Sequence, residues 1–396
     1  MSVKTTKAIR EGLEGVVVGN SGICVIDGHA GSLRYRGIDI SDLAEHSTFE
    51  ETVYLLWHDE LPSQTQLEAF KAQLASLREL DDNIWHMLSA LPSGLQPMEA
   101  LRSVVSVLGS SDPDRLDNTR EANARRAMRL VAKMPTILAY YYRHHMLGKG
   151  RVHPDPALGH AANFLYMLRG ERPTPLQERA MDLALVLMAE HEMNASTFAA
   201  RVTASTLSDM YSAISSAIGT LKGPLHGGAN QRAMEMLMDI GEITQVEPYI
   251  DAALSAKQRI MGFGHRIYKV IDPRAIHLRD MLEDLCLESG DLQWHRLAEE
   301  VAQVVSTKKD GLHPNVDFFA APLMFVMGVP VDLFTPIFAI SRTAGWTAHV
   351  MEQYQHNRLL RPVSNYIGQV DRNYTHISQR NGNGNGNGNG NSQLDG

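Results

Sequence analysis

Residues Leu176–Glu190, with the sequence LQERAMDLALVLMAE, decide the fold class of this 396-residue chain. The second half of the segment is apolar on nearly every side of a helix, and such a helix must be buried inside a large protein body. Its uninterrupted apolar run, Leu183–Ala189, is much shorter than the roughly 18 residues that a membrane-spanning helix needs. The segment therefore predicts a mainly α-helical protein and no membrane association.

Further helical patterns lie on both sides of this segment. Ser63 and Gln66 form a capping box, and apolar residues then recur at helical spacing. The stretch 118–145 is rich in Ala, Arg, Leu and Met and predicts a long helix. Pro135 lies inside it, and we expect this proline to break or kink the helix because it lacks a backbone N–H.

Signals for strands are few. Ile23–Ile26, the turn residues Asp27-Gly28 and a segment ending at Leu33–Tyr35 predict a small β-hairpin near the N-terminus. The Gly-rich segment Gly223–Gly228 and the Pro-bearing segment Gly328–Pro336 bracket a long helical stretch and are possible hinges. The tail from 381 onwards alternates Asn and Gly and cannot form a core, so we expect it to be disordered.

Composition excludes several classes of function. Hydrophobic residues make up 44% and charged residues 21%, as in globular proteins. The net charge of −8 argues against a nucleic-acid-binding protein, although a polyanionic small ligand could still bind a locally positive pocket. Cys24 and Cys286 form no C-x-x-C pair, which favours a reducing, cytoplasmic location and disfavours a Cys-rich metal site.

The common nucleotide and zinc motifs are absent from the sequence. The run at 262–267 has Ile where a dinucleotide fingerprint requires its third Gly. The Gly-Lys pair at 148–149 is followed by Gly, which excludes a P-loop. The His-Glu pair at 191–192 leads to Ala195 where a zinc protease has its second His. We therefore expect no metal site.

Five segments concentrate polar residues in apolar or Gly-rich surroundings and could carry chemistry. They are HEMNAST at 191–197, GPLHGGAN at 223–230, GFGHRIYK at 262–269, HPNVDFF at 313–319 and ISRTAGW at 340–346. His226 lies in a Gly-rich turn at a helix start, where positive potential would lower its pKa and keep it an uncharged donor. Asp317 lies beside apolar residues, which would raise its pKa and make it useful as a base.

Each of these residues also has an ordinary structural explanation when taken singly. His226, His265 and His191 could be turn or core histidines, and Asp317 could cap a helix. Arg274 could simply begin a helix, while Arg342 and Arg361 could be surface or ion-pair residues. Several arginines among histidines nevertheless suit a ligand with more than one carboxylate, because arginine binds carboxylates bidentately.

Together the segments resemble the citrate synthase family. GPLHGGAN, GFGHRIY followed by DPRA at 272–275, PNVDFF and SRTAGW stand in the family's order and spacing, and HEMNAST and YRGIDI at 35–40 match as well. The resemblance runs from about Gly12 to about Ile367. It implies a two-domain helical fold with a large domain (1–226 and 332–380), a small domain (227–331) and the disordered tail 381–396. It also implies a homodimer or higher homo-oligomer whose interdomain cleft closes on substrate.

The resemblance also implies a role for individual residues. His226 resembles the histidine that stabilises the enol of acetyl-CoA, Asp317 the base that removes a methyl proton, and His265 the histidine that polarises the oxaloacetate carbonyl. The implied oxaloacetate ligands are His191, Arg274 and Arg342, with Arg361 contributed by the other subunit. The implied coenzyme A contacts are Arg259, Ile260, Met261, Gly262, Phe263 and Lys269.

The activity implied by the resemblance is condensation of acetyl-CoA, oxaloacetate and water to citrate and CoA. Acetyl-CoA is then a co-substrate, and no permanently bound cofactor or metal is needed. Two alternatives remain open. The first is 2-methylcitrate synthesis from propanoyl-CoA, which would use the same catalytic groups. The second is a catalytically inactive helical assembly protein that keeps only the fold.

Overall fold

The fold is known from a computed structural model that describes residues 9–380. The predicted disordered tail at 381–396 lies outside the described residues. The chain divides into two units. The first combines the two ends of the chain, and its described residues, 9–18 and 361–380, include the short 3₁₀ turns η1 (Glu11–Leu13) and η5 (Ile377–Gln379). The second unit, Gly19–Leu360, holds all the other elements in the described part of the chain.

The second unit confirms the mainly helical prediction, with 16 α-helices and three short strands among its residues. The elements are β1 Cys24–Asp27, β2 Ser32–Tyr35, β3 Ile38–Asp39, α1 Ile40–His46, α2 Phe49–His58, α3 Gln64–Ser76, α4 Asp82–Ser89, α5 Pro97–Ser111, α6 Arg120–Tyr141, η2 Tyr142–Met146, α7 His160–Arg169, α8 Pro175–Met188, α9 Ala195–Ser205, α10 Met210–Leu221, α11 Ala229–Ile240, η3 Ile243–Gln245, α12 Val246–Ser255, α13 Pro273–Ser289, α14 Gln293–Lys308, α15 Val316–Val326, η4 Val331–Leu333 and α16 Phe334–Gln355.

The predicted N-terminal hairpin is present. β1 pairs with β2 in antiparallel register, with Cys24 opposite Tyr35 and Asp27 opposite Ser32. A third strand, β3, extends the sheet antiparallel to β2. The sequence analysis missed β3 because two residues are too few for alternation to be recognised.

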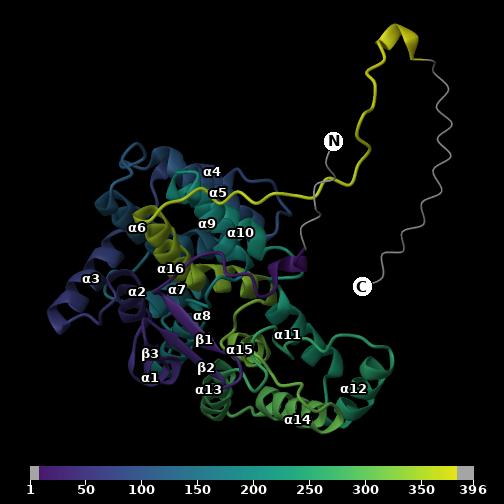
Figure 1. The fold of residues 1–396 in the computed structure, drawn as a ribbon. Helices are drawn as coiled ribbons and strands as arrows, with labels where there is room; N and C mark the ends of the chain where they lie inside the picture. Colours follow the sequence, from purple (N-terminus) through teal and green to yellow (C-terminus); the bar gives the residue numbers. More distant parts are fainter. Residues whose placement is uncertain (1–8, 381–396) are drawn as a thin grey trace. The chain divides into compact units, whose positions relative to one another are not determined.

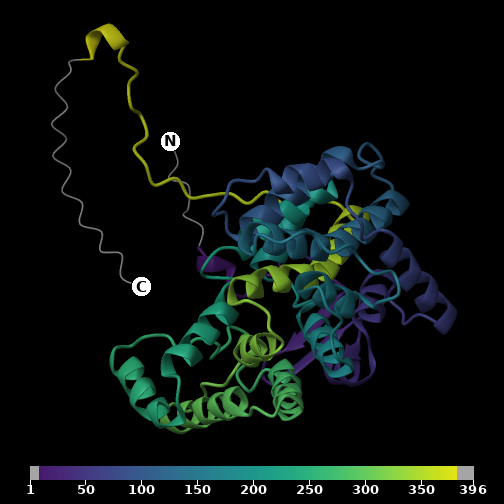
Figure 2. The same cartoon turned by 180° about the vertical axis from the view of Figure 1, so that it is seen from behind.

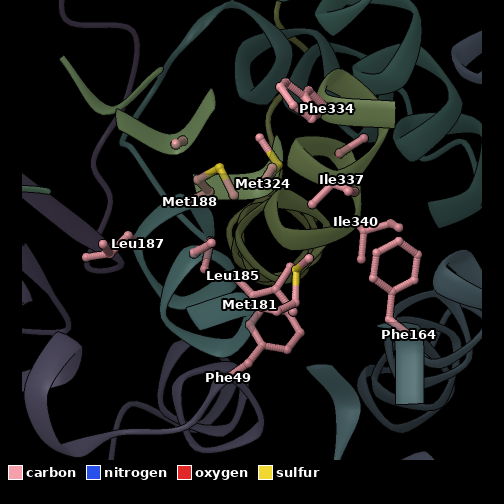
Figure 3. Close-up of a cluster of buried hydrophobic side chains, with 14 of the residues drawn as sticks. Phe49, Phe164, Met181, Leu185, Leu187, Met188, Met324, Phe334, Ile337 and Ile340 are labelled. Carbon is pink, nitrogen blue, oxygen red and sulfur yellow. The ribbon is translucent and has the colours of Figure 1, made fainter. Parts of the chain in front are cut away.

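Helix α8 forms the centre of the core, as its apolar sequence predicts. All nine residues from Ala180 to Met188 are buried. Figure 3 shows Met181 of α8 beside Phe49 of α2, and Ile340 of α16 beside Phe164 of α7. A helix enclosed on all sides buries apolar area from every face, which is the main favourable contribution to folding.

Pro135 does not break its helix, so the first of the two outcomes expected at this residue is wrong, and a kink there stays a prediction. α6 continues over 22 residues, with Pro135 and both of its neighbours buried. The helix packs against α5, α7 and α16. We attribute its continuity to this packing, which offsets the hydrogen bond lost at the proline.

Helices α9, α11, α13, α15 and α16 bring the polar segments of the second unit together. α16 packs against α8 and α9, while α15 packs against α11 and α13. Figures 1 and 2 show α15 lying between α11 and α13 from both sides. Among residues 9–380, no helix combines the length and apolar character that crossing a bilayer requires.

Candidate active site

The turn that carries His226 is tightly built. The amide of His226 donates to the carbonyl of Gly223 at 2.9 Å. Gly227 leaves no space for a side chain, because a Cβ there would lie 1.9 Å from the carbonyl oxygen of Leu221 at the end of α10. Gly228 then caps α11 with a φ of 76°, which glycine adopts without strain. The Gly-rich sequence thus allows the turn that carries His226 to pack closely against the end of α10.

The ring of His226 is held from one side by Ser196. The backbone N–H of Ser196 donates to Nε2 of His226 at 3.3 Å, and Oγ of Ser196 lies 2.8 Å from the same nitrogen. Because an amide can only donate, Nε2 is an acceptor, and the proton of an uncharged ring is on Nδ1. Ser196 is itself fixed, since its Oγ lies 2.7 Å from Oδ1 of Asn194 and accepts from Nε1 of Trp346 at 3.1 Å.

His226 is uncharged at neutral pH, as predicted, and burial is the main cause. Burial lowers the pKa of the half-buried His226 ring to about 4, and the positive charge of Arg342 contributes to the decrease. His226 therefore offers an N–H donor without a charge.

His265 has the opposite tautomer, fixed by its own loop. Nδ1 of His265 accepts from the amides of Ile267 and Tyr268, both at 3.1 Å. The proton of the uncharged ring is therefore on Nε2. Burial, followed by the charge of Arg274, lowers the pKa of His265 to about 4.

Two distant segments pair to place Asp317 beside the His265 loop. The amide of Gly264 donates to the carbonyl of His313 at 2.8 Å, and the amide of Asn315 donates to the carbonyl of Gly262 at 2.9 Å. Gly262 has a φ of 78°, and a Cβ there would lie 2.7 Å from Cβ of Phe318. Glycine thus permits the close approach of this loop to α15.

Asp317 has the character of a base. Asn315, not Asp317, caps α15, because its side chain accepts from the amide of Asp317 at 3.0 Å. The structural alternative for Asp317, helix capping, is therefore wrong. Burial raises the pKa of Asp317 to about 6, and the charges of Arg274 and Arg342 oppose that increase. A carboxyl with a raised pKa is a stronger base when ionised.

Arg274 is buried and held by a carboxylate. Asp272 accepts from Nε and Nη2 of Arg274 at 3.0 and 2.7 Å. The same carboxylate accepts at 3.2 Å from the amide of Val316, the first residue of α15. One buried aspartate therefore fixes both Arg274 and the start of the helix that carries Asp317.

Arg342 is buried without an acidic partner in direct contact. Its Nε donates to the carbonyl of Met188 at 2.7 Å, and its guanidinium group lies 4.7 Å from the ring centroid of Phe338. Within residues 9–380, its two Nη atoms make no hydrogen bond. Burial lowers the pKa of Arg342, opposed by the carboxylate of Glu190. A buried guanidinium edge whose Nη atoms have no partner among the described residues suits a carboxylate ligand.

His191 completes this group. Its ring is buried, with Nε2 3.4 Å from the hydroxyl of Tyr268 and its centroid 5.2 Å from that of His265. Burial holds the pKa of His191 well below its usual value, and the charge of Arg274 adds to the decrease. The structure thus gathers every predicted catalytic residue and three of the four predicted oxaloacetate ligands in one region.

Arg361 and Lys269, the two other predicted site residues outside the proposed coenzyme A loop, are exposed and do not belong to this buried group. Arg361 belongs to the first unit and is exposed. Lys269 is exposed, and its ammonium group donates to the carbonyl of Arg266 at 3.3 Å. Lys269 does not line the cavity described next.

A cavity of about 690 Å³ opens beside these groups. His226 and His265 both line it, as do all five residues of the predicted coenzyme A loop, Arg259–Phe263. Its cationic residues are Arg232, Lys257, Arg259, Arg266 and Lys309, and no carboxylate side chain from the described part of the chain lines it. A cavity with this charge suits a polyanion.

The sequence analysis missed four of these cations, namely Arg232, Lys257, Arg266 and Lys309. Lys257 and Arg266 flank the predicted loop closely, so a count of charge around GFGH could have found them. Arg232 on α11 and Lys309 after α14 come from separate segments, and the sequence offered no signal for them. Among the described residues, no group of three or more His, Cys, Asp or Glu side chains is arranged to hold a metal ion.

The arrangement offers a specific set of chemical groups. A weakly acidic carboxyl, two uncharged imidazoles with opposite donor nitrogens, and two buried arginines lie beside a cationic cavity. Such a set can remove a proton, hydrogen-bond two separate oxygens, and hold carboxylates. These are the requirements of carbon–carbon bond formation at an acyl group.

Known proteins resemble this chain over nearly its whole length. The family model described as "Citrate synthase, C-terminal domain" matches residues 12–363. The citrate synthase of Haloferax volcanii is 48% identical over 378 residues, covering 94% of this chain and 99% of that protein. The 2-methylcitrate synthase 1 of Corynebacterium glutamicum is 41% identical over 379 residues, covering 94% and 98%.

Solved structures agree with the sequence comparison. The citrate synthase of Thermoplasma acidophilum, solved as a ternary complex with carboxymethyl coenzyme A and oxaloacetate, has a TM-score of 0.88 and 32% identity. The match covers 95% of this chain and all of that one. This chain therefore belongs to the citrate synthase family and is an acyltransferase of the citrate synthase type.

Proposed function

We propose that the chain condenses acetyl-CoA with oxaloacetate and water to give citrate and CoA. One observation carries the proposal: a carboxyl of raised pKa, Asp317, accompanies two uncharged imidazoles whose proton-bearing nitrogens are fixed. The reaction needs one base and two hydrogen-bond donors.

Proton removal is the difficult step. The methyl group of a thioester is a very weak acid, so a free carbanion would be too unstable to form. In the proposed mechanism, Asp317 accepts the methyl proton while Nδ1–H of His226 hydrogen-bonds the thioester oxygen. A preorganised donor of this kind stabilises the enol more than the starting thioester, and removal of one such donor typically costs about 10²–10³ in kcat.

The remaining groups of the site are assigned to oxaloacetate. We assign Nε2–H of His265 to the ketone oxygen, which makes the ketone carbon more electrophilic. Arg274, Arg342 and His191 bind the carboxylates and offset their charge. The methylene carbon of the enol then attacks the ketone carbon, and the ketone oxygen takes a proton from Nε2 of His265 as the new bond forms. Water hydrolyses the citryl thioester to release CoA, and the methyl proton taken up by Asp317 restores the proton that His265 gave up.

Coenzyme A is assigned to the cationic cavity. Arg259–Phe263 would contact the adenine moiety, and the cavity's cations would neutralise the phosphates. Lys269 remains a predicted phosphate contact. No group needs to remain bound between turnovers, because acetyl-CoA is consumed as a co-substrate.

We also propose a homodimer with a shared site. Arg361 would reach the oxaloacetate site of the other copy, and residues 227–331 would move as a small domain that closes over substrate and excludes bulk water. The predicted cytoplasmic location is part of the same proposal.

Arg361→Ala and Asp317→Asn are each expected to be nearly inactive alone. Their mixed dimers should regain roughly a quarter of wild-type activity, since half of randomly paired dimers contain one intact site. No recovery would contradict sharing.

The direct test is release of free CoA thiol from acetyl-CoA, measured with and without oxaloacetate and in parallel with propanoyl-CoA. We expect oxaloacetate-dependent release with a higher kcat/KM for acetyl-CoA. A preference for propanoyl-CoA would instead support the 2-methylcitrate alternative, since one methylene changes discrimination by only ~1–3 kcal/mol. No release with either thioester would support the inactive assembly protein.

A further inference from the structure

A buried chain of polar groups connects α8, α9 and α16 behind the oxaloacetate ligands. Nε2 of His349 lies 3.0 Å from Oε1 of Glu190, and Nδ1 of His349 lies 3.0 Å from Nη1 of Arg201. Arg201 also pairs with Glu352 at 2.5 Å. Glu190 and His349 are fully buried, and Arg201 is 6% exposed. None of these residues belongs to the proposed chemistry.

The bond directions in this chain follow from its chemistry. Arginine can only donate, so Nδ1 of His349 is an acceptor and its proton is on Nε2. His349 therefore donates to Glu190 and accepts from Arg201, bridging a carboxylate and a guanidinium group. The other carboxylate oxygen of Glu190 is buried with no partner within the described residues. His349 is thus the one hydrogen-bond partner of this buried carboxylate there.

The bridge lies where two proposed oxaloacetate ligands are anchored. Glu190 directly precedes His191, and its carbonyl accepts from the hydroxyl of Tyr35 at 2.8 Å. His349 follows Arg342 by seven residues on α16, about two helical turns, so both face the same side. The bridge therefore joins the end of α8, which precedes His191, to the helix that carries Arg342.

The approach of α16 to the end of α8 is unusually close. A Cβ at Gly345 would lie 2.0 Å from the unpaired oxygen of Glu190 and 2.5 Å from the carbonyl oxygen of Ala189. The amide of Gly345 donates to that carbonyl at 3.2 Å. Only a glycine allows this approach, so the carboxylate of Glu190 is enclosed between the two helices.

The connection from α8 to α9 needs an external restraint. Glu192 has a φ of 54°, in the left-handed region that non-glycine residues seldom adopt. Such a conformation persists only where the surroundings impose it. Glu190 precedes the strained residue, and Arg201 lies on the helix that follows it, so His349 ties both flanks of the connection to α16.

We propose that His349 is a positioning residue that fixes His191 relative to Arg342, and so sets the affinity of the site for the dicarboxylate oxaloacetate. This inference rests on the proposed function. Loss of His349 would leave both oxygens of Glu190 buried without a partner. The end of α8 would then move toward any available donor, and His191 would move with it.

The test compares His349→Leu with His349→Gln. Leucine fills a similar volume but neither donates nor accepts, whereas the glutamine amide can accept from Arg201 and donate to Glu190. Oxaloacetate binding is measured by titration calorimetry on the whole protein, independently of turnover. We expect His349→Leu to raise the dissociation constant at least about tenfold and His349→Gln to stay within about threefold. The KM for acetyl-CoA should be unchanged in both variants. A general loosening of the fold would change this KM as well.

Leu101→Ala on α5 is the matched control, because Leu101 is a fully buried apolar residue with no assigned role in the proposed site, so its loss should destabilise the core without changing oxaloacetate affinity. If His349→Leu does not fold, His349→Asn takes its place, since its shorter amide cannot reach both neighbours. The inference is overturned if the glutamine variant loses as much affinity as the leucine or asparagine variant, or if none loses affinity. If the wild-type protein binds no oxaloacetate, the proposed function fails first, and this inference with it.

Discussion

The two loops that carry His226 and His265 reach the same electrostatic result by different routes. Both rings are uncharged, with pKa values lowered to about 4 mainly by burial. His265 is fixed by amides two and three residues further along its own loop. His226 is fixed by Ser196, which is 30 residues away on α9. The two tautomers are opposite as a consequence.

The two rings therefore differ in which structural changes can displace them. Misplacement of His265 requires its own loop to change, whereas misplacement of His226 requires only that α9 or α16 shift. Ser196 depends on both helices, through Asn194 at the start of α9 and Trp346 on α16. We therefore expect His226 to be sensitive to remote substitutions and His265 to be sensitive mainly to local ones.

The largest decrease in kcat should come from removing Asp317, the proposed base. Asp317→Asn is expected to lower kcat by about 10³, within the range for a general base, while oxaloacetate still binds. Steady-state kinetics and calorimetry measure the two quantities separately. If kcat is near normal, Asp317 is not the base, and the proposed mechanism lacks the group that removes the methyl proton.

Removing either ring should separate their roles. His226→Ala is expected to lower kcat by about 10²–10³ with oxaloacetate affinity unchanged, because this ring acts on the thioester. His265→Ala should lower kcat and also weaken oxaloacetate binding. The same kinetic and calorimetric measurements apply, and the reverse pattern of affinities would mean that the two assignments must be exchanged.

The pH dependence distinguishes the histidines from Asp317. Asp317 must be ionised to accept a proton, and its pKa is raised to about 6. kcat/KM should therefore fall about tenfold per pH unit below that value, as one carboxylate is protonated. The histidines have pKa values near 4 and remain uncharged through this range. A decrease that begins only near pH 4 would place the controlling titration on the histidines.

The smallest effect tests the remote support of His226. Ser196→Ala keeps the amide donor but removes Oγ, so we expect kcat to fall by about threefold to tenfold with oxaloacetate affinity unchanged. Ser103→Ala on α5 is the control, because that hydroxyl donates only to the carbonyl of Glu99. Equal losses in the two variants would argue against a specific role for Ser196.

Much of the fold was predictable because its signals are local. The apolar sequence of α8 and the turn residues of the hairpin each identify an element without reference to the rest of the chain. Pro135 shows the limit of such reasoning, since packing against three neighbouring helices maintains α6 through a residue that breaks isolated helices. β3 was missed because two residues carry no pattern.

The site divides in the same way. The amides that fix the tautomer of His265 lie within its own short segment, and the resemblance to the family identified that segment. The partner of His226, the contact of His349 with Glu190, and the cavity cations Arg232 and Lys309 depend on helices that are distant in sequence. Spacing along the chain contains no information about such contacts.

A histidine-selective ¹⁵N NMR spectrum at pH 7 tests the central claim most directly, with the two signals assigned by their disappearance in His226→Ala and His265→Ala. The account predicts two uncharged rings, His226 protonated on Nδ1 and His265 on Nε2. A charged ring at either position, or the same tautomer at both, would contradict it.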